Sequence, residues 1–286
     1  MANRTARLLL KSVGTVLAVA SLGLQQGCSE LFFYPDRVEY TQPAALGLHA
    51  EDIYLDTPDG ERLHAWWIPA RGTAQGTVYF LHGNAQNLSA HLLNAAWLAE
   101  QGYNLFALDY RGYGRSTGSP DLDGAQIDIQ TGLDWLKARP HTAPHFLLGQ
   151  SLGGALATLL AAQTPEPAFA GIVLDGTFAG FRQIAREKLD SFWLTWPLQV
   201  PLSWTLPADR EPADLIAQIA PTPILIIHSR GDHIIPFHHG TQLYAAAGQP
   251  RQFLATETPH TATFLVPAYR EQVLSFFARA ADIPLP

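Results

Sequence analysis

The stretch of sequence that decides the fold is Leu147-Leu148-Gly149-Gln150-Ser151-Leu152-Gly153-Gly154. Residues 145–148 predict a strand, and residues 152–162, rich in Leu and Ala, predict a helix. The pattern G-x-S-x-G between a strand and a helix is typical of a nucleophile elbow, a strained turn that requires small residues two positions before and after the serine. We therefore expect Ser151 to project its hydroxyl at the start of a helix, where free N–H groups favour developing negative charge.

A serine hydroxyl is a weak nucleophile, so this prediction requires a base and an orienting acid later in the chain. An apolar run at residues 223–228 predicts a buried strand, and Asp232 follows it. A further strand is predicted at residues 251–256, and His260 lies in the loop after it. We expect Ser151 to attack a carbonyl carbon, His260 to accept the proton and return it, and Asp232 to orient the imidazole.

Other residues compete for these two roles. Asp175 ends an apolar strand predicted at residues 171–174 and is the alternative to Asp232 as the acid. The competing histidines are His228, His233, His238 and His239. The first is expected to be a core histidine, the second to point away from the acid, and the last two to be exposed at the start of a helix. The histidines lack the spacing of a metal motif, so no metal site is expected.

An oxyanion hole is predicted where the apolar strand at residues 78–81 ends in His82 and Gly83. The backbone N–H of Asn84 and that of Leu152 are its expected donors. A glycine-rich loop also follows the strand at residues 105–108, but its glycine spacing and the absence of a following helix disfavour a dinucleotide site. No cofactor is therefore expected.

Taken together, these motifs resemble the α/β-hydrolase superfamily, and within it the branch of serine aminopeptidase-like hydrolase domains. The resemblance spans about residues 76–280 and rests on His82-Gly83-Asn84, Asp109-Tyr110-Arg111-Gly112-Tyr113-Gly114, Gly149 to Gly154, Gly231-Asp232 to Pro236, and His260. It implies an α/β fold with a mostly parallel central sheet, helices on both faces and a Ser-Asp-His triad. Such motifs are specific for fold and machinery but poor guides to substrate.

The composition agrees with one catalytic domain, expected over residues 29–286. Hydrophobic residues make up 47% of the chain and charged residues 15%. An extended pair is predicted at residues 52–55 and 62–68, followed by alternating strands and helices that imply a parallel sheet. The net charge of −7 and the absence of a basic stripe disfavour nucleic acid as a partner.

The first 28 residues are expected to be an export signal of bacterial lipoprotein type. Basic residues precede an apolar segment at residues 13–24, which is too short to span a bilayer by itself. Cys28, the single cysteine of the chain, follows Gly27 at the position that resembles an acylated lipoprotein cysteine. Because Ser29 rather than aspartate follows it, the resemblance favours the outer membrane. A single N-terminal membrane anchor, which would include residues 8–24, remains the alternative.

A cap insertion is predicted at about residues 177–214, where the strand alternation is interrupted. The segment carries several aromatic residues, among them Trp193, Trp196 and Trp204. An aromatic surface above the nucleophile would form an apolar acyl pocket. Ordinary packing of helices against the domain is the alternative explanation for these side chains.

The sequence thus predicts a membrane-tethered serine hydrolase that cleaves an ester, or a thioester or amide, through an acyl-enzyme. Its expected substrate is a small-molecule or lipid-like acyl compound. A peptidase or an acyltransferase with the same triad, and a noncatalytic binding module on a hydrolase scaffold, are the alternatives. Acyl length, leaving group and oligomeric state are left open by the sequence.

Overall fold

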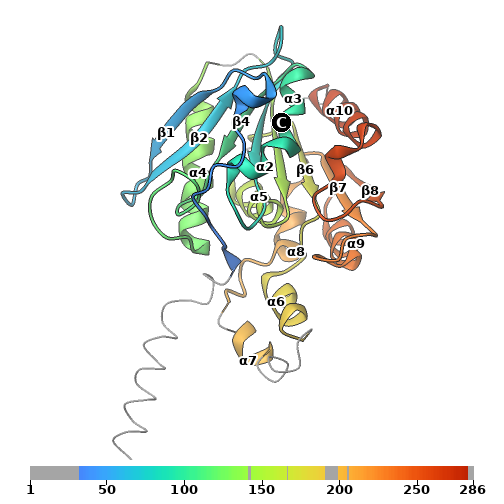
Figure 1. Cartoon of the computed structure of the whole chain (residues 1–286). Coiled ribbons are helices and arrows are strands. Elements are labelled where there is room, and N and C mark those ends of the chain that lie inside the picture. Colours follow the sequence, from blue (N-terminus) through green and yellow to red (C-terminus); the bar gives the residue numbers. More distant parts are fainter. Residues whose placement is uncertain (1–31, 141–142, 166, 191–198, 205, 283–286) are drawn as a thin grey trace, which may run out of the picture.

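The computed structural model describes residues 32–140, 143–165, 167–190, 199–204 and 206–282. Within this part of the chain, eight strands form one sheet in the order β1-β2-β4-β3-β5-β6-β7-β8 (Figure 1). The strands are β1 (Glu51–Asp56), β2 (Arg62–Ile68), β3 (Gly76–Leu81), β4 (Tyr103–Leu108), β5 (His145–Gln150), β6 (Gly171–Asp175), β7 (Ile224–Ser229) and β8 (Arg251–Thr256). Strand β2 pairs antiparallel with β1 and β4, and all other pairs are parallel.

Helices cover both faces of this sheet. The helices of the described part of the chain, those beyond the sheet included, are η2 (Pro43–Leu46), α2 (Leu88–Ala95), α3 (Trp97–Glu100), α4 (Leu122–Ala138), α5 (Leu152–Gln163), α6 (Phe181–Asp190), α7 (Gln199–Ser203), α8 (Pro212–Leu215), η4 (Ile216–Ile219), α9 (Phe237–Ala246), η5 (Thr263–Leu265) and α10 (Pro267–Ala281). Successive strand residues point to opposite faces, so Tyr79 and Leu147 pack with α4 and α5, whereas Phe80 and Leu148 pack with α2, α3 and α10.

The predicted fold class is therefore confirmed: the protein has the α/β-hydrolase fold. Strands β3, β5 and β7 are buried along their whole length, as expected for parallel strands covered on both faces. In the edge strand β8, by contrast, only Thr256 is buried. The predicted β1–β2 pair, joined through Pro58-Asp59-Gly60, is also present.

Between β6 and β7 the chain forms α6, α7 and α8, within the predicted cap segment. Figure 1 shows α6 and α7 beyond one end of the sheet, apart from the helices that cover its faces. Trp193 and Trp196 of this segment lie outside the described residues, as do Cys28 and the whole predicted export signal. The boundaries of the cap and of the catalytic domain stay predictions.

Before the sheet begins, residues 32–40 run along the loop that follows β3, and we call them the N-terminal strap. This segment forms the first part of the dark blue trace in Figure 1. Pro35 forms a parallel bridge with Gln86, and the N–H of Asp36 donates to the carbonyl of Gln86 at 3.1 Å. The strap is thus attached to the loop in which the oxyanion hole is predicted.

Candidate active site

The turn between β5 and α5 has the strained geometry of a nucleophile elbow. Ser151 has φ 53° and ψ −120°, a conformation that residues with a side chain rarely adopt. A Cβ on Gly149 would lie 2.4 Å from the carbonyl oxygen of Gly153, and one on Gly153 would lie 2.1 Å from that of Leu81. The two glycines are therefore required by close backbone contacts, as the motif predicts.

The structure brings Ser151, His260 and Asp232 together in one hydrogen-bonded chain. Nε2 of His260 lies 3.0 Å from Oγ of Ser151, and Nδ1 lies 2.6 Å from Oδ2 of Asp232. The other carboxylate oxygen of Asp232 accepts from the N–H groups of Ile234 and Ile235, each at 2.8 Å. Burial would raise the pKa of Asp232, but its bonds to His260 and these N–H groups lower it below the usual value. The acid therefore stays ionised beside the imidazole.

The alternative acid, Asp175, is bonded elsewhere. Its carboxylate accepts from Nε2 of Gln150 and from Oγ1 of Thr263, each at 2.7 Å. Burial raises the pKa of Asp175, and these two donors oppose the shift. Because Nδ1 of His260 is bonded to Asp232, the geometry favours Asp232 as the orienting acid. Asp175 instead ties the elbow to the segment after the histidine, a connection that sequence analysis missed.

The loop after β3 brings Asn84 beside the elbow, where Asn84, Ser151 and Leu152 line one cavity. The side-chain oxygen of Asn84 accepts from the N–H groups of Tyr34 at 2.8 Å and Ala85 at 2.7 Å, and from the hydroxyl of Tyr113 at 3.0 Å. This role of the Asn84 side chain, as acceptor for three donors, cannot be recognised from its motif. It fixes the side chain and leaves the backbone of the loop next to the serine.

A buried polar cluster supports the root of this loop. Nε2 of His82 lies 3.3 Å from Oδ1 of Asp109, which also accepts from the N–H of Leu88 at 2.7 Å. Tyr110 donates its hydroxyl to the carbonyl of His82 at 2.9 Å. Burial would raise the pKa of Asp109, but hydrogen bonds from His64 and His82 lower it. The carboxylate therefore holds the strand end in place without reaching the serine.

The cavity at the serine has a volume of about 500 Å³ and is lined largely by apolar side chains. It is lined by Phe32, Tyr34, Asn84, Ser151, Leu152, Phe178, Ile184, Ala185, Lys188, Leu189, Leu206, Ile234 and Ile235. Trp204 is absent from these described lining residues, and its side chain is 64% exposed because it follows the last turn of α7 on the solvent side. The aromatic wall that sequence analysis assigned to the tryptophans consists, in the described residues, of two strap residues and Phe178.

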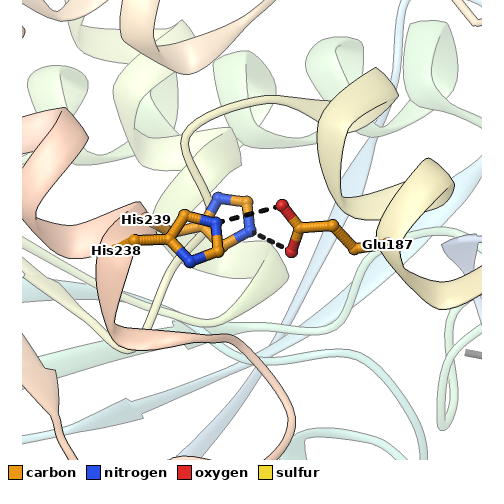
Figure 2. A group of neighbouring side chains, drawn as sticks. All are labelled: Glu187, His238 and His239. Carbon is orange, nitrogen blue, oxygen red and sulfur yellow. Dashed lines mark hydrogen bonds and ion pairs between the residues drawn. The ribbon is translucent and has the colours of Figure 1, made fainter. Parts of the chain in front are cut away.

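Helix α6, which carries part of this wall, is attached to the rest of the molecule mainly by polar contacts. The carboxylate of Glu211 accepts from the N–H groups of Phe181 and Arg182 at its first turn. Nε of Arg182 donates to the carbonyl of Leu206 at 2.8 Å. At the other end, Glu187 contacts two histidines of α9 (Figure 2).

These two histidines differ in environment, and the prediction that both are exposed is wrong for His239. His239 is fully buried, because Nε2 lies 3.0 Å from Glu187 and Nδ1 accepts the N–H of Ala179 at 3.1 Å. His238 is exposed, and its Nε2 lies 3.0 Å from the other oxygen of Glu187. The predicted core histidine His228 is buried, with Nε2 3.0 Å from the carbonyl of Ile235.

Glu187, His238 and His239 present three ligand atoms within 4.8 Å of one another, a set that a divalent cation could use. The hydrogen bond to Nδ1 of His239 argues against that use. An imidazole nitrogen that accepts a backbone N–H carries no proton, so the proton of neutral His239 is on Nε2. Nε2 then donates to Glu187 rather than offering a lone pair to a metal. The cluster therefore links α6 to α9 by hydrogen bonds.

Comparison with known proteins shows the family and the fold to which the chain is similar. Residues 72–215 match the model of the family described as serine aminopeptidase, S33. An uncharacterized protein of Salmonella typhi, YfhR, is 35% identical over 87% of each chain. The lysophosphatidylserine lipase ABHD12 of Gallus gallus is 30% identical over 76% of this chain and 56% of its own. The Pyrococcus furiosus esterase Pf2001 superposes with a TM-score of 0.70 over 87% of this chain and 97% of its own, at 22% identity.

A membrane-spanning helix is not found among the described residues, where each helix is too short or too polar to cross a bilayer.

Proposed function

The chain belongs to the α/β-hydrolase superfamily and to its serine aminopeptidase S33 family, and from this premise we propose that it cleaves esters through a covalent acyl-enzyme. The observation that carries the proposal is the continuous chain Ser151–His260–Asp232, with steps of 3.0 and 2.6 Å, whose serine opens into an apolar cavity. An ordinary structural serine would need neither a strained backbone nor a histidine on its hydroxyl.

The first half of the reaction forms the acyl-enzyme. Oγ of Ser151 attacks the ester carbonyl carbon while Nε2 of His260 accepts the hydroxyl proton. The tetrahedral intermediate then collapses, the bond to the leaving oxygen breaks, and the imidazolium returns its proton to the departing alcohol. Asp232 stabilises the imidazolium that exists between these two proton transfers.

The second half releases the acid. Water attacks the acyl carbon with His260 as base, Oγ of Ser151 leaves and recovers a proton, and the carboxylic acid departs. In both halves the oxyanion would accept hydrogen bonds from the backbone N–H groups of Leu152 and Asn84, which flank the serine. These N–H groups would stabilise the oxyanion because they are oriented before the charge develops.

The lining of the cavity favours an ester with an apolar acyl group over a peptide with a free amino terminus. A peptide amine would call for a carboxylate at the cavity wall, and its described lining includes neither Asp nor Glu. Among the lining side chains that the structure describes, only that of Lys188 is charged, and it is a cation. The esterase and the lipase named among the similar proteins also act on acyl compounds, which supports the same choice.

A fluorophosphonate probe combined with a panel of esters tests this function. The wild type should be labelled and should hydrolyse esters, and Ser151→Ala should do neither while keeping the same thermal midpoint. Ser229→Ala is the matched control, because Ser229 is the last residue of the parallel strand β7 and its hydroxyl donates to the carbonyl of Thr258 rather than to a histidine. A protein that takes no label and cleaves no ester would be a binding module instead.

Products distinguish the remaining alternatives. Faster cleavage of aminoacyl amides than of esters would indicate a peptidase. Acyl transfer to added alcohols in preference to water would indicate an acyltransferase.

We further propose that the protein is tethered to a membrane through a lipid on Cys28, a site supported by its sequence context alone. Cys28→Ser should then release the hydrolase from the membrane fraction with its ester turnover unchanged. Mass spectrometry that finds an unmodified Cys28 with residues 1–27 still attached would contradict the proposal and support the single N-terminal anchor.

A further inference from the structure

The N-terminal strap lies outside the segment that matches the family model, yet it reaches the cavity of Ser151. Phe32 and Tyr34 line that cavity, whereas Phe33 between them is buried and contacts the ring of Tyr113 with centroids 6.5 Å apart. Phe32 belongs to a 3₁₀ turn and the next two residues are irregular, and this local backbone places Phe32 and Tyr34 at the cavity and Phe33 against the core. The strap therefore contributes wall to the cavity as well as packing to the fold.

Phe32 stands at the point where the strap meets the cap segment. Its ring lies edge-on to Phe181, with centroids 5.6 Å apart, and 6.4 Å from that of Phe178. Phe178 lines the cavity, and Phe181 begins α6. The rings of Phe32 and Phe178, both packed against Phe181, give one side of the cavity a hydrocarbon surface, where the acyl chain of a substrate bound at Ser151 would lie.

The backbone of the next cavity residue is bonded to the oxyanion loop. Tyr34 donates its N–H to the side-chain oxygen of Asn84 at 2.8 Å, and this oxygen also accepts from Ala85 and Tyr113. Ala85 and Gln86 have φ of 65° and 60°, so the loop adopts an unfavourable conformation that its contacts must maintain. The strap thus holds the loop through Asn84, the residue whose backbone N–H is the proposed oxyanion donor.

The strap is itself fixed on its far side. The side-chain amide of Asn87 donates to the carbonyls of Asp36 and Val38 and to the carboxylate of Asp36, at distances from 2.7 to 3.3 Å. Tyr40 donates its N–H to Oγ of Ser89 at 2.9 Å. These bonds make the cavity face of the strap a preformed surface rather than a loop that orders on binding.

We propose that the strap is a working part of the substrate site, in which Phe32 and Tyr34 select the acyl chain and the Tyr34–Asn84 hydrogen bond positions the oxyanion loop. The proposal rests on the ester hydrolysis proposed above and adds its substrate class: esters whose acyl chain is long enough to pass from Ser151 to the ring of Phe32. Esters too short to reach the strap should depend on the oxyanion loop but not on Phe32.

Substitutions that shrink and enlarge the wall test the selectivity. In a series of linear acyl esters, Phe32→Ala should lower the preference of kcat/KM for the best medium chain over acetate by roughly tenfold, the worth of about two methylene contacts. Phe32→Trp should shift the optimum to a shorter chain. Tyr54→Ala is the control, because Tyr54 is a half-exposed aromatic residue on the edge strand β1 and does not line the cavity.

The positioning role is tested with acetate esters, which do not reach the strap. Asn84→Ala removes the acceptor but keeps the backbone N–H, so kcat should fall roughly tenfold or more with little change in KM. Asn84→Asp keeps an acceptor oxygen for the three donors and should restore most of kcat. A purely structural role would instead lower the thermal midpoint of both variants without this difference in turnover.

The outcomes separate this proposal from the one it rests on. Wild type that is labelled and active, with unchanged acyl preference in both Phe32 variants and unchanged kcat in Asn84→Ala, overturns the role of the strap and leaves the hydrolase intact. Wild type that neither takes the probe nor cleaves esters overturns both.

Discussion

The elbow and helix α6 both line the same cavity but are held by different forces. Ser151 lies between the buried strand β5 and the largely buried helix α5, and its N–H donates to the carbonyl of Asp175 at 2.9 Å. Helix α6 buries only Phe181 and Ile184 among its described residues and is attached otherwise by ionic and hydrogen-bonding side chains. Regions with few buried apolar contacts open at lower free energy than the core. The backbone at Ser151 is therefore held rigidly, whereas helix α6 is the part of the cavity wall that a single substitution can loosen.

The largest effect should come from the rigid side. Ser151→Ala removes the nucleophile, and the rate of ester hydrolysis should fall by about 10⁴- to 10⁶-fold, the magnitude known for protease triads. The thermal midpoint should stay within the error of the wild type, because the hydroxyl is bonded only to His260 in the described contacts. Residual turnover above roughly 1% of the wild-type rate would show that Ser151 is not the nucleophile.

The two buried acids should separate chemistry from support. Asp232→Asn should lower kcat by about 10⁴-fold with a small change in stability, because it disturbs the tautomer of His260. Asp175→Asn should act mainly on stability, by about 1–3 kcal/mol, since its amide nitrogen would replace the oxygen that accepts from one of the two donors, Gln150 or Thr263. Urea unfolding gives the free energy of unfolding of each variant, and ester kinetics give its kcat. The reverse pattern would transfer the orienting role to Asp175.

Removal of the carboxylate that accepts from the first turn of helix α6 should change acyl selectivity more than it changes the rate on acetate esters. Glu211→Ala leaves two N–H groups of the first turn without their acceptor and should cost about 1 kcal/mol, or roughly 2–4 °C in the thermal midpoint. Acetate turnover should stay near that of the wild type, whereas the preference for longer esters should weaken because Ile184 and Ala185 line the cavity. Equal losses on all esters would show that α6 supports the elbow itself.

The smallest expected effect is a pH dependence of the α6–α9 contact. Burial lowers the pKa of His239, and Glu187 only partly opposes this shift. A histidine whose pKa is lower folded than unfolded binds its proton more readily in the unfolded chain, so its contribution to stability is lost as the pH falls below about 6.5. Protonated Nδ1 would itself carry an N–H that faces the N–H of Ala179, so the hydrogen bond from Ala179 would be lost.

From about pH 7.5 to about pH 5.5, the thermal midpoint of His239→Gln should therefore fall less steeply than that of the wild type. The difference between the two slopes is the quantity to compare, because burial also lowers the pKa of His91, to about 4, and that of His228. The exposed His238 contacts the same carboxylate, and His238→Gln serves as the matched control. Parallel slopes in all three proteins would mean that acid acts elsewhere.

The sequence predicted the sheet and the three residues of the candidate triad because both depend on local signals. A strained serine turn needs glycines at fixed positions, and parallel strands deliver their ends to one edge of the sheet. Asp232 and His260 could therefore be placed from apolar runs alone. Their neighbours could not, since the partners of Asp175 lie 25 and 88 positions away in the chain.

The prediction for the pocket wall differs from the structure at Trp204, whereas Trp193 and Trp196 lie outside the described residues. Aromatic content does not say which side chains turn inward, and the described Trp204 faces solvent while Phe32 and Tyr34 of the strap line the cavity. The strap has no periodic pattern to mark it. His239 was misplaced in the same way, because its burial depends on Glu187, 52 positions earlier.

The position of the strap has a consequence for where substrate is encountered. Phe32 comes four residues after Cys28, and four residues span at most about 14 Å even when fully extended. A lipid on Cys28 would therefore keep the Phe32 side of the cavity within that distance of the bilayer surface. Turnover would then follow the surface density of esters in the lipid phase rather than their bulk concentration, and dilution of the substrate with inert lipid would slow the enzyme at constant total substrate.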